Sequence, residues 1–314
     1  MVRSVDIRGL PHAYSLTSET AVPTVLVFVH GWLLSQAYWQ PVIQHLSADY
    51  QCLSYDLRGF GQSQPIADYN IHPQTLEQRS EAIAVGASCS RSLTEVPTSR
   101  SEYAHTPAAY AEDLLQLLQA LNIQNAWLVG HSLGGSIALW AAHQSPSAIA
   151  GVVCVNSGGG IYLKEEFERF RMAGTQLVKL RPRWLPQVPL LDVPFARMNV
   201  AQPISRQWAR QRLLDWVAAH PTAALGALLE STTEAEVHYL PRLVAGLPQP
   251  VYFLAGEQDD VMEPTYVNHL ASFHPLFECC GHNVLQVSNC GHLSMLEHPG
   301  TVAQYIRQVV TLHS

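Results

Sequence analysis

The chain has 314 residues, of which 47% are hydrophobic, so it can bury a large core, which argues against general disorder. Its net charge of −7 argues against a general nucleic-acid-binding protein. Residues 1–16 carry charges throughout, without the apolar segment of a secretory signal, and no apolar run approaches the length of a membrane span. The six cysteines show no Cys-x-x-Cys spacing, so we expect no metal, no cofactor and a reducing, cytoplasmic compartment.

The first 60 residues predict an edge strand followed by two buried strands with a helix between them. The edge strand is expected around residues 6–16. The next strand, 22–29, contains the unbroken apolar run Val25–Val29, typical of a parallel strand buried on both faces. A helix over 37–46 and a strand over 51–55 follow. Strands and helices that alternate at this spacing predict a mostly parallel sheet with helices on both faces.

Two later segments interrupt this pattern. Residues 64–106 are rich in proline, serine and threonine without periodicity, and a segment of that length is expected to be functional or disordered. Residues 161–245 show helix-like segments and proline breaks but no clear strand. Outside them the expected helices are 109–121 and 302–312, and the expected strands are 126–129, 151–155, 251–255 and 283–287.

The stretch Gly130-His131-Ser132-Leu133-Gly134 separates a short apolar strand from a helical pattern that runs to Pro146. Its G-x-S-x-G spacing is typical of a nucleophile elbow, a tight turn that exposes the serine hydroxyl above a sheet. A side chain at Gly130 or Gly134 would collide across such a turn. We therefore predict Ser132 as a catalytic nucleophile.

A serine nucleophile needs a base and an acid that orients the base, and two strand ends supply candidates. Asp259 directly follows the strand 251–255, and His292 lies in the loop after the strand 283–287. The order Ser, Asp, His matches that of this type of elbow. Asp260 is a rival for the acid, whereas Asn156, at another strand end, carries no charge.

The chain resembles serine hydrolases of the α/β-hydrolase fold over most of its length. The motifs that carry the resemblance are His30-Gly31-Trp32, Asp56-x-Arg58-Gly59-x-Gly61-x-Ser63, the elbow at Ser132, Gly256-x-x-Asp259, and Gly291-His292 with Glu297 and Pro299 beyond. The resemblance implies Ser132 as nucleophile, His292 as base and Asp259 as orienting acid. It also implies an oxyanion hole formed by the backbone N–H groups of Trp32 and Leu133.

The same resemblance implies a division of the chain. Residues 1–160 and 246–314 would form the α/β-hydrolase core, with the irregular insertion at 64–106, and residues 161–245 would form a mobile helical cap over the substrate pocket.

Three further residues or pairs receive structural interpretations. His30 is expected to brace the loop that carries Trp32, and His131 to line the pocket. Asp56 and Arg58 are interpreted as a structural turn pair.

The leading hypothesis for function is hydrolysis of a carboxylic ester, hydrophobic or lipid-like, through an acyl-enzyme. The same triad could instead transfer the acyl group, or cleave a thioester or a C–C bond, because fold and triad do not determine the substrate. A third hypothesis is a ligand receptor that keeps a slow triad. The serine nucleophile argues against dehalogenase or epoxide hydrolase chemistry, which needs a carboxylate. The oligomeric state stays open.

The charge is distributed unevenly along the chain. Residues 164–215 contain ten Lys or Arg against five Asp or Glu, whereas the rest of the chain is strongly acidic. A basic, apolar cap could contact an anionic membrane peripherally. The competing interpretation is that these arginines pair with the acidic core and that the apolar residues form the interior of the cap.

Overall fold

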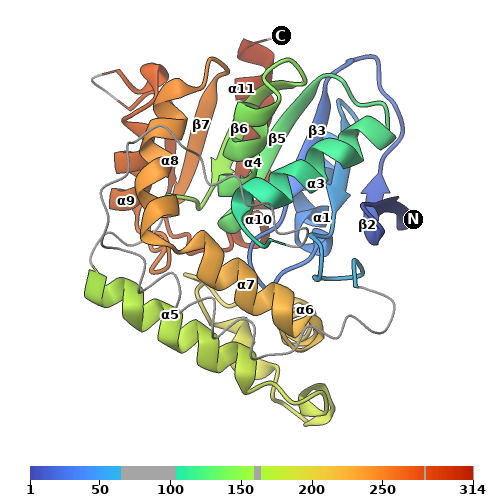
Figure 1. The fold of residues 1–314 in the computed structure, drawn as a ribbon, viewed down its shortest axis with the longest axis vertical. Coiled ribbons are helices and arrows are strands. Elements are labelled where there is room, and N and C mark those ends of the chain that lie inside the picture. The colour runs from blue at the N-terminus through green and yellow to red at the C-terminus, as the bar shows by residue number, and fades with distance from the viewer. Residues whose placement is uncertain (65–103, 159–163, 279–280, 314) are drawn as a thin grey trace, which may run out of the picture. The chain divides into compact units, whose positions relative to one another are not determined.

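The computed structural model describes residues 1–64, 104–158, 164–278 and 281–313, and contains one sheet of eight strands. The strand order is β1-β2-β4-β3-β5-β6-β7-β8 (Figure 1). The β1–β2 and β2–β4 pairs are antiparallel, and every other pair is parallel. The predicted α/β architecture with a mostly parallel sheet is therefore confirmed.

The strands are β1 (Arg3–Ile7), β2 (Leu10–Leu16), β3 (Val25–Val29), β4 (Gln51–Tyr55), β5 (Ala126–His131), β6 (Ile149–Val155), β7 (Val251–Gly256) and β8 (Val284–Val287). The single edge strand expected around 6–16 is instead a hairpin. Arg8 and Gly9 both have positive φ, at 57° and 78°, which turns the chain tightly between β1 and β2. The alternation of apolar and polar residues in this edge segment was too weak to reveal the turn between the two strands.

The helices are α1 (Gln40–Leu46), α3 (Pro107–Ala120), α4 (Leu133–Gln144), α5 (Lys164–Lys179), α6 (Arg206–Ala218), α7 (Pro221–Ser231), α8 (Glu234–Gly246), α9 (Pro264–Ala271), α10 (Ser294–Glu297) and α11 (Pro299–Leu312). Strand β3 shows how the layers are built, since alternate residues point to opposite faces. Val25, Val27 and Val29 belong to the core cluster that also contains residues of α3, α4, α8 and α9. Leu26 and Phe28 belong to a second cluster, which contains residues of α1 and α11.

In its described residues the chain between β6 and β7 contains the helices α5 to α8 and no strand, with turns and two short 3-10 helices between α5 and α6 (Figure 1). Helix α5 packs on α7, whereas α8 packs on the core helix α4 through a stack of Trp140 on Tyr239. The predicted division into core and cap at 161–245 stays a prediction. The expected insertion at 64–106 lies almost wholly outside the described residues.

In the part of the chain that the structure describes, no helix combines the length and the apolar composition needed to cross a bilayer.

Candidate active site

Ser132 lies between β5 and α4 in a strained turn. Its backbone adopts φ 52° and ψ −119°, outside the usual regions for a residue with a side chain. A Cβ on Gly130 would lie 2.2 Å from the Gly134 carbonyl oxygen, and one on Gly134 would lie 2.3 Å from the Val29 carbonyl oxygen. The predicted steric reason for both glycines is thus confirmed. Leu133 is the first residue of α4, so its N–H has no intrahelical partner and is available beside Ser132.

Asp259 and His292, from the loops after β7 and β8, form a buried pair. The His292 Nδ1 lies 2.8 Å and 3.1 Å from the two carboxylate oxygens of Asp259. The carboxylate also accepts hydrogen bonds from the backbone N–H groups of Val261 and Met262, each at 2.9 Å. Burial disfavours the charged carboxylate, but His292 and these hydrogen bonds outweigh it, so the pKa of Asp259 lies below its ordinary value. A charged Asp259 is suited to orient the His292 ring.

Asn156 is a part of the site whose role the sequence did not reveal. It follows β6 with a positive φ of 48°, and its Nδ2 donates to Asp259 at 2.8 Å and to the Gly291 carbonyl at 3.1 Å. Its Oδ1 accepts from the Ser294 hydroxyl at 2.6 Å. One buried amide thereby joins the ends of β6, β7 and β8.

Glu297 holds the loop that carries His292. Its carboxylate accepts from the N–H groups of Gly291 at 3.1 Å and Leu293 at 3.2 Å, on either side of His292. It also accepts from the Ala201 N–H at 2.7 Å, which ties this loop to the helical segment before α6. The motif in which Glu297 follows Gly291-His292 therefore has a mechanical role, since it fixes the backbone around the ring.

His131, which was expected to line the pocket, contacts the loop that carries His292. The side chain is buried, and its Nε2 donates to the His292 backbone carbonyl at 2.7 Å. The two rings lie 4.7 Å apart between centroids. Burial, together with the neighbouring His292, lowers the pKa of His131 to about 3, so the ring is neutral and acts as a brace. This contact also brings His292 next to the residue that precedes Ser132.

Trp32 lies in a loop that is held by its own indole and by His30. Its indole Nε1 donates to the Ala224 carbonyl of α7 at 2.7 Å. His30 bridges the same loop to the start of the next, because its Nδ1 contacts the Gly31 carbonyl at 2.7 Å and its Nε2 accepts from the Leu57 N–H at 2.9 Å. This agrees with the bracing role predicted for His30. The backbone N–H of Trp32 donates to no backbone carbonyl in the loops and turns that the structure describes. This N–H could therefore donate to a ligand.

The rival acid Asp260 lies away from the His292 ring. It is exposed, and among the described residues its carboxylate accepts one side-chain hydrogen bond, from Asn199 Nδ2 at 3.4 Å. The Asn199 carbonyl accepts from the His292 N–H at 2.9 Å. In the same part of the chain no hydrogen bond joins Ser132 to His292, and such catalytic contacts commonly tighten only when substrate binds.

Asp56 and Arg58 are both structural, but they have separate partners. Asp56 accepts from the N–H groups of Gln36 at 2.7 Å and Gln62 at 2.9 Å, which holds the turn after β4. Arg58 instead forms a buried ion pair with Asp113 of α3, with Nε and Oδ2 3.0 Å apart. The predicted turn pair is corrected accordingly, because an ion pair with a distant helix cannot be found from spacing.

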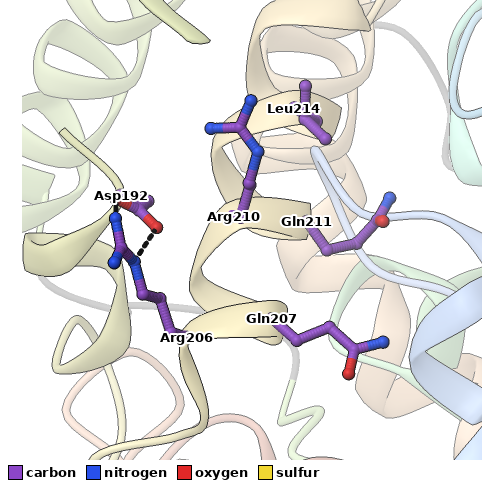
Figure 2. A pocket seen from close by; sticks show the side chains of 6 residues that line it. All are labelled: Asp192, Arg206, Gln207, Arg210, Gln211 and Leu214. Carbon is purple, nitrogen blue, oxygen red and sulfur yellow. Dashed lines mark hydrogen bonds and ion pairs between the residues drawn. The ribbon is translucent and has the colours of Figure 1, made fainter. Parts of the chain in front are cut away.

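A hollow of about 580 Å³ lies elsewhere, beside α6. It is lined by Asp192, Arg206, Gln207, Arg210, Gln211 and Leu214 (Figure 2). None of these residues belongs to the elbow or to the Asp259–His292 pair. In the described part of the chain no group of three His, Cys, Asp or Glu side chains is placed to hold a metal ion.

The order of strands, the elbow after β5 and the paired loops after β7 and β8 define an α/β hydrolase. A family model described as "alpha/beta hydrolase fold" matches residues 24–299, and the chain belongs to this family.

The relatives have more specific names. The chain is 27% identical over 293 residues to 2-succinyl-6-hydroxy-2,4-cyclohexadiene-1-carboxylate synthase of Enterobacter sp. (strain 638), covering 91% of this chain and 92% of that protein. A relative with the same name from Salmonella newport (strain SL254) is 26% identical over 305 residues, covering 96% of this chain and 99% of that protein. Among solved structures, an esterase from Rhodococcus sp. ECU1013 superposes with a TM-score of 0.71 at 21% identity, covering 100% of this chain and 99% of that chain. At that identity the likeness shows the fold alone.

Proposed function

We propose that this protein is a serine hydrolase that cleaves a carboxylic ester, hydrophobic or lipid-like, through an acyl-enzyme on Ser132. The observation that carries the proposal is the buried Asp259–His292 pair, held against the elbow by His131. A lone serine hydroxyl is a weak nucleophile, and a neutral imidazole oriented by a carboxylate is the usual means of activating it.

In the proposed reaction the Ser132 Oγ attacks the ester carbonyl carbon while His292 Nε2 takes the hydroxyl proton. Asp259 keeps the other ring proton on Nδ1, so Nε2 is free to accept. The N–H groups of Trp32 and Leu133 donate to the oxyanion. The bond to the alcohol then breaks, and His292 returns the proton to the leaving oxygen. Water repeats these steps on the acyl-enzyme and releases the carboxylic acid.

The core and cap division enters the proposal as the means of covering the substrate. Trp32 offers its N–H to the oxyanion while its indole bonds the Ala224 carbonyl of α7. The helical segment 161–245 and the proposed oxyanion hole are thus mechanically connected.

A second candidate rests on the named relatives. Their similarity spans more than nine-tenths of this chain, and their name describes the synthesis of 2-succinyl-6-hydroxy-2,4-cyclohexadiene-1-carboxylate. The same triad could support this chemistry, with His292 as a base activated through Asp259. Formation of that product, followed by mass spectrometry, should be assayed beside ester turnover. A kcat/KM for esters well below about 10⁴ M⁻¹s⁻¹, the lower end of the ordinary range for enzymes, with efficient formation of the product, would favour the second candidate.

The test of the first candidate combines fluorophosphonate labelling with turnover of p-nitrophenyl esters from acetate to caprylate. Ser132→Ala should abolish labelling and lower kcat by a factor on the order of 10⁶. Ser136→Ala, one turn further along α4, is the matched control and should keep both activities. Labelling that persists in a folded Ser132→Ala protein would remove Ser132 as the nucleophile.

A further inference from the structure

The exposed large apolar side chains are concentrated in one segment. Eight of the twelve found among the described residues lie between 172 and 214. The surface from α5 to α6 is therefore richer in exposed apolar side chains than the rest of the described surface. They are Met172, Leu177, Leu180, Trp184, Leu190, Val193, Met198 and Leu214. The interpretation that apolar residues in this region form the interior of a cap therefore fails for these eight.

Helix α5 has one buried face and one face exposed to solvent. Gly174 and Val178, one turn apart, are buried towards α7, where a Cβ on Gly174 would touch Leu228. Met172 and Lys179 lie on the opposite face of the helix, because residues seven apart share a face. Figure 1 shows α7 between α5 and the core helices. The outer face of α5 thus exposes the apolar Met172 and the basic Lys179, together with the acidic Glu168 one turn before Met172.

Four arginines of the segment have partners within it or in the adjoining helix. Arg171, Arg181 and Arg212 are wholly or partly buried and donate to backbone carbonyls, so they hold the segment together. Arg206 pairs with Asp192 at 3.0 Å (Figure 2).

Five further cations of the segment are exposed: Arg169, Lys179, Arg183, Arg197 and Arg210. Within the described residues none of these five forms an ion pair with a carboxylate. The alternative in which the basic residues pair with the acidic core is therefore not seen for these five.

We propose that this surface, formed by the outer face of α5, residues 180–198 and the exposed side of α6, docks on an anionic lipid bilayer. Leu180 and Trp184 are 68% and 57% exposed and stand beside Lys179 and Arg183. Apolar side chains that enter the headgroup region and cations that meet lipid phosphates are the two contributions that peripheral binding combines. The chain as a whole carries −7, so binding to an anionic surface must come from this local distribution.

This docking does not depend on ester hydrolysis, and its test measures vesicle binding and self-association instead of ester turnover. The full chain is co-sedimented with vesicles of phosphatidylcholine, and with vesicles containing 30% phosphatidylglycerol, at low and moderate salt. We expect binding to the anionic vesicles only, weakened by salt because screening shortens the range of the attraction.

Two matched pairs of variants locate the surface. Lys179→Gln with Arg183→Gln should weaken binding roughly 30-fold, at about 5-fold per charge. Arg3→Gln with Arg242→Gln removes the same charge from exposed, distant positions and should change binding less than about 3-fold. Leu180→Gln should weaken binding even at moderate salt, whereas Leu312→Gln, at 70% exposure on α11, should not.

Three results would overturn the proposal. The first is equal or negligible binding to both kinds of vesicle. The second is an equal loss of binding in both charge pairs, which would assign the effect to net charge. The third is a dimer in sedimentation equilibrium that Leu180→Gln dissociates, without vesicle binding, which would assign the surface to a second copy of the chain.

Discussion

Replacing Asp259 by asparagine removes the negative charge behind His292 while keeping the shape of the side chain. One carboxylate oxygen accepts from two backbone N–H groups of the following loop, each at 2.9 Å. The other accepts from His292 Nδ1 and Asn156 Nδ2, each at 2.8 Å. An amide has only one oxygen for these two sets of donors, so its NH₂ group must face one of them.

The less disruptive orientation leaves the amide oxygen on the loop and turns the NH₂ group towards His292. The Nδ1 must then accept, which moves the ring proton to Nε2, the atom that should take the proton of Ser132. We expect kcat for the best ester to fall by about 10²–10⁴-fold. The unfolding free energy should fall by about 1–3 kcal/mol, the usual cost of an unsatisfied buried donor.

Asp260→Asn is the control, because it makes the same chemical change at an exposed neighbour whose partner is an asparagine side chain. Steady-state kinetics with p-nitrophenyl esters, and urea unfolding of both variants, provide the comparison. A loss of kcat in Asp260→Asn that equals or exceeds the loss in Asp259→Asn would refute this assignment of the acid.

Three other substitutions test the surroundings of the site. Trp32→Phe removes the indole hydrogen bond to Ala224 and should lower kcat about 3–10-fold, the equivalent of about 1 kcal/mol. Gly134→Ala places a Cβ 2.3 Å from a carbonyl oxygen of β3 and should lower the unfolding free energy by about 1–3 kcal/mol in urea denaturation. Burial raises the pKa of Glu236 from 4.5 to about 7, although Trp140 donates to it. The folded protein therefore keeps a proton that the unfolded chain loses above pH 4.5, and stability falls as the pH rises to 7, by about 3 kcal/mol relative to Glu236→Gln.

Each of these predictions has an outcome that contradicts it. An increase in KM with unchanged kcat in Trp32→Phe would show that the indole contacts substrate and does not position the loop. Gly246→Ala, where a new Cβ meets nothing within 4 Å, is the control for Gly134→Ala, and equal losses in the two would refute the steric argument. A pH profile of Glu236→Gln that parallels the wild type between pH 5 and 8 would assign the titration to another group.

The sequence by itself determined the parallel sheet and the residues at its carboxyl edge. The apolar run Val25–Val29 and its counterparts show which segments are buried strands, and residues that follow such strands must meet at one edge. This is why Ser132, Asp259 and His292 could be proposed from their positions alone. The G-x-S-x-G turn was predictable for a local reason, since the clashes at its glycines arise within a few residues of chain or from the adjacent strand.

Only the tertiary structure decided which side chains support these residues. Asn156, Glu297 and His131 all contact the loop that carries His292. Only Glu297 is close to His292 in the sequence, so the other two contacts could not be predicted from spacing. Hydrogen bonds of this kind depend on how the crossovers bring separate strand ends together, and they leave no periodicity in the chain.

The same limit applies to the surface of the helical segment. Composition showed that residues 164–215 are basic and apolar, but could not separate the buried Arg181 from the exposed Arg183. That division is decided by packing, because Arg181 donates to the carbonyls of Val178 and Trp216 on neighbouring helices, whereas Arg183 lies beyond them in solvent.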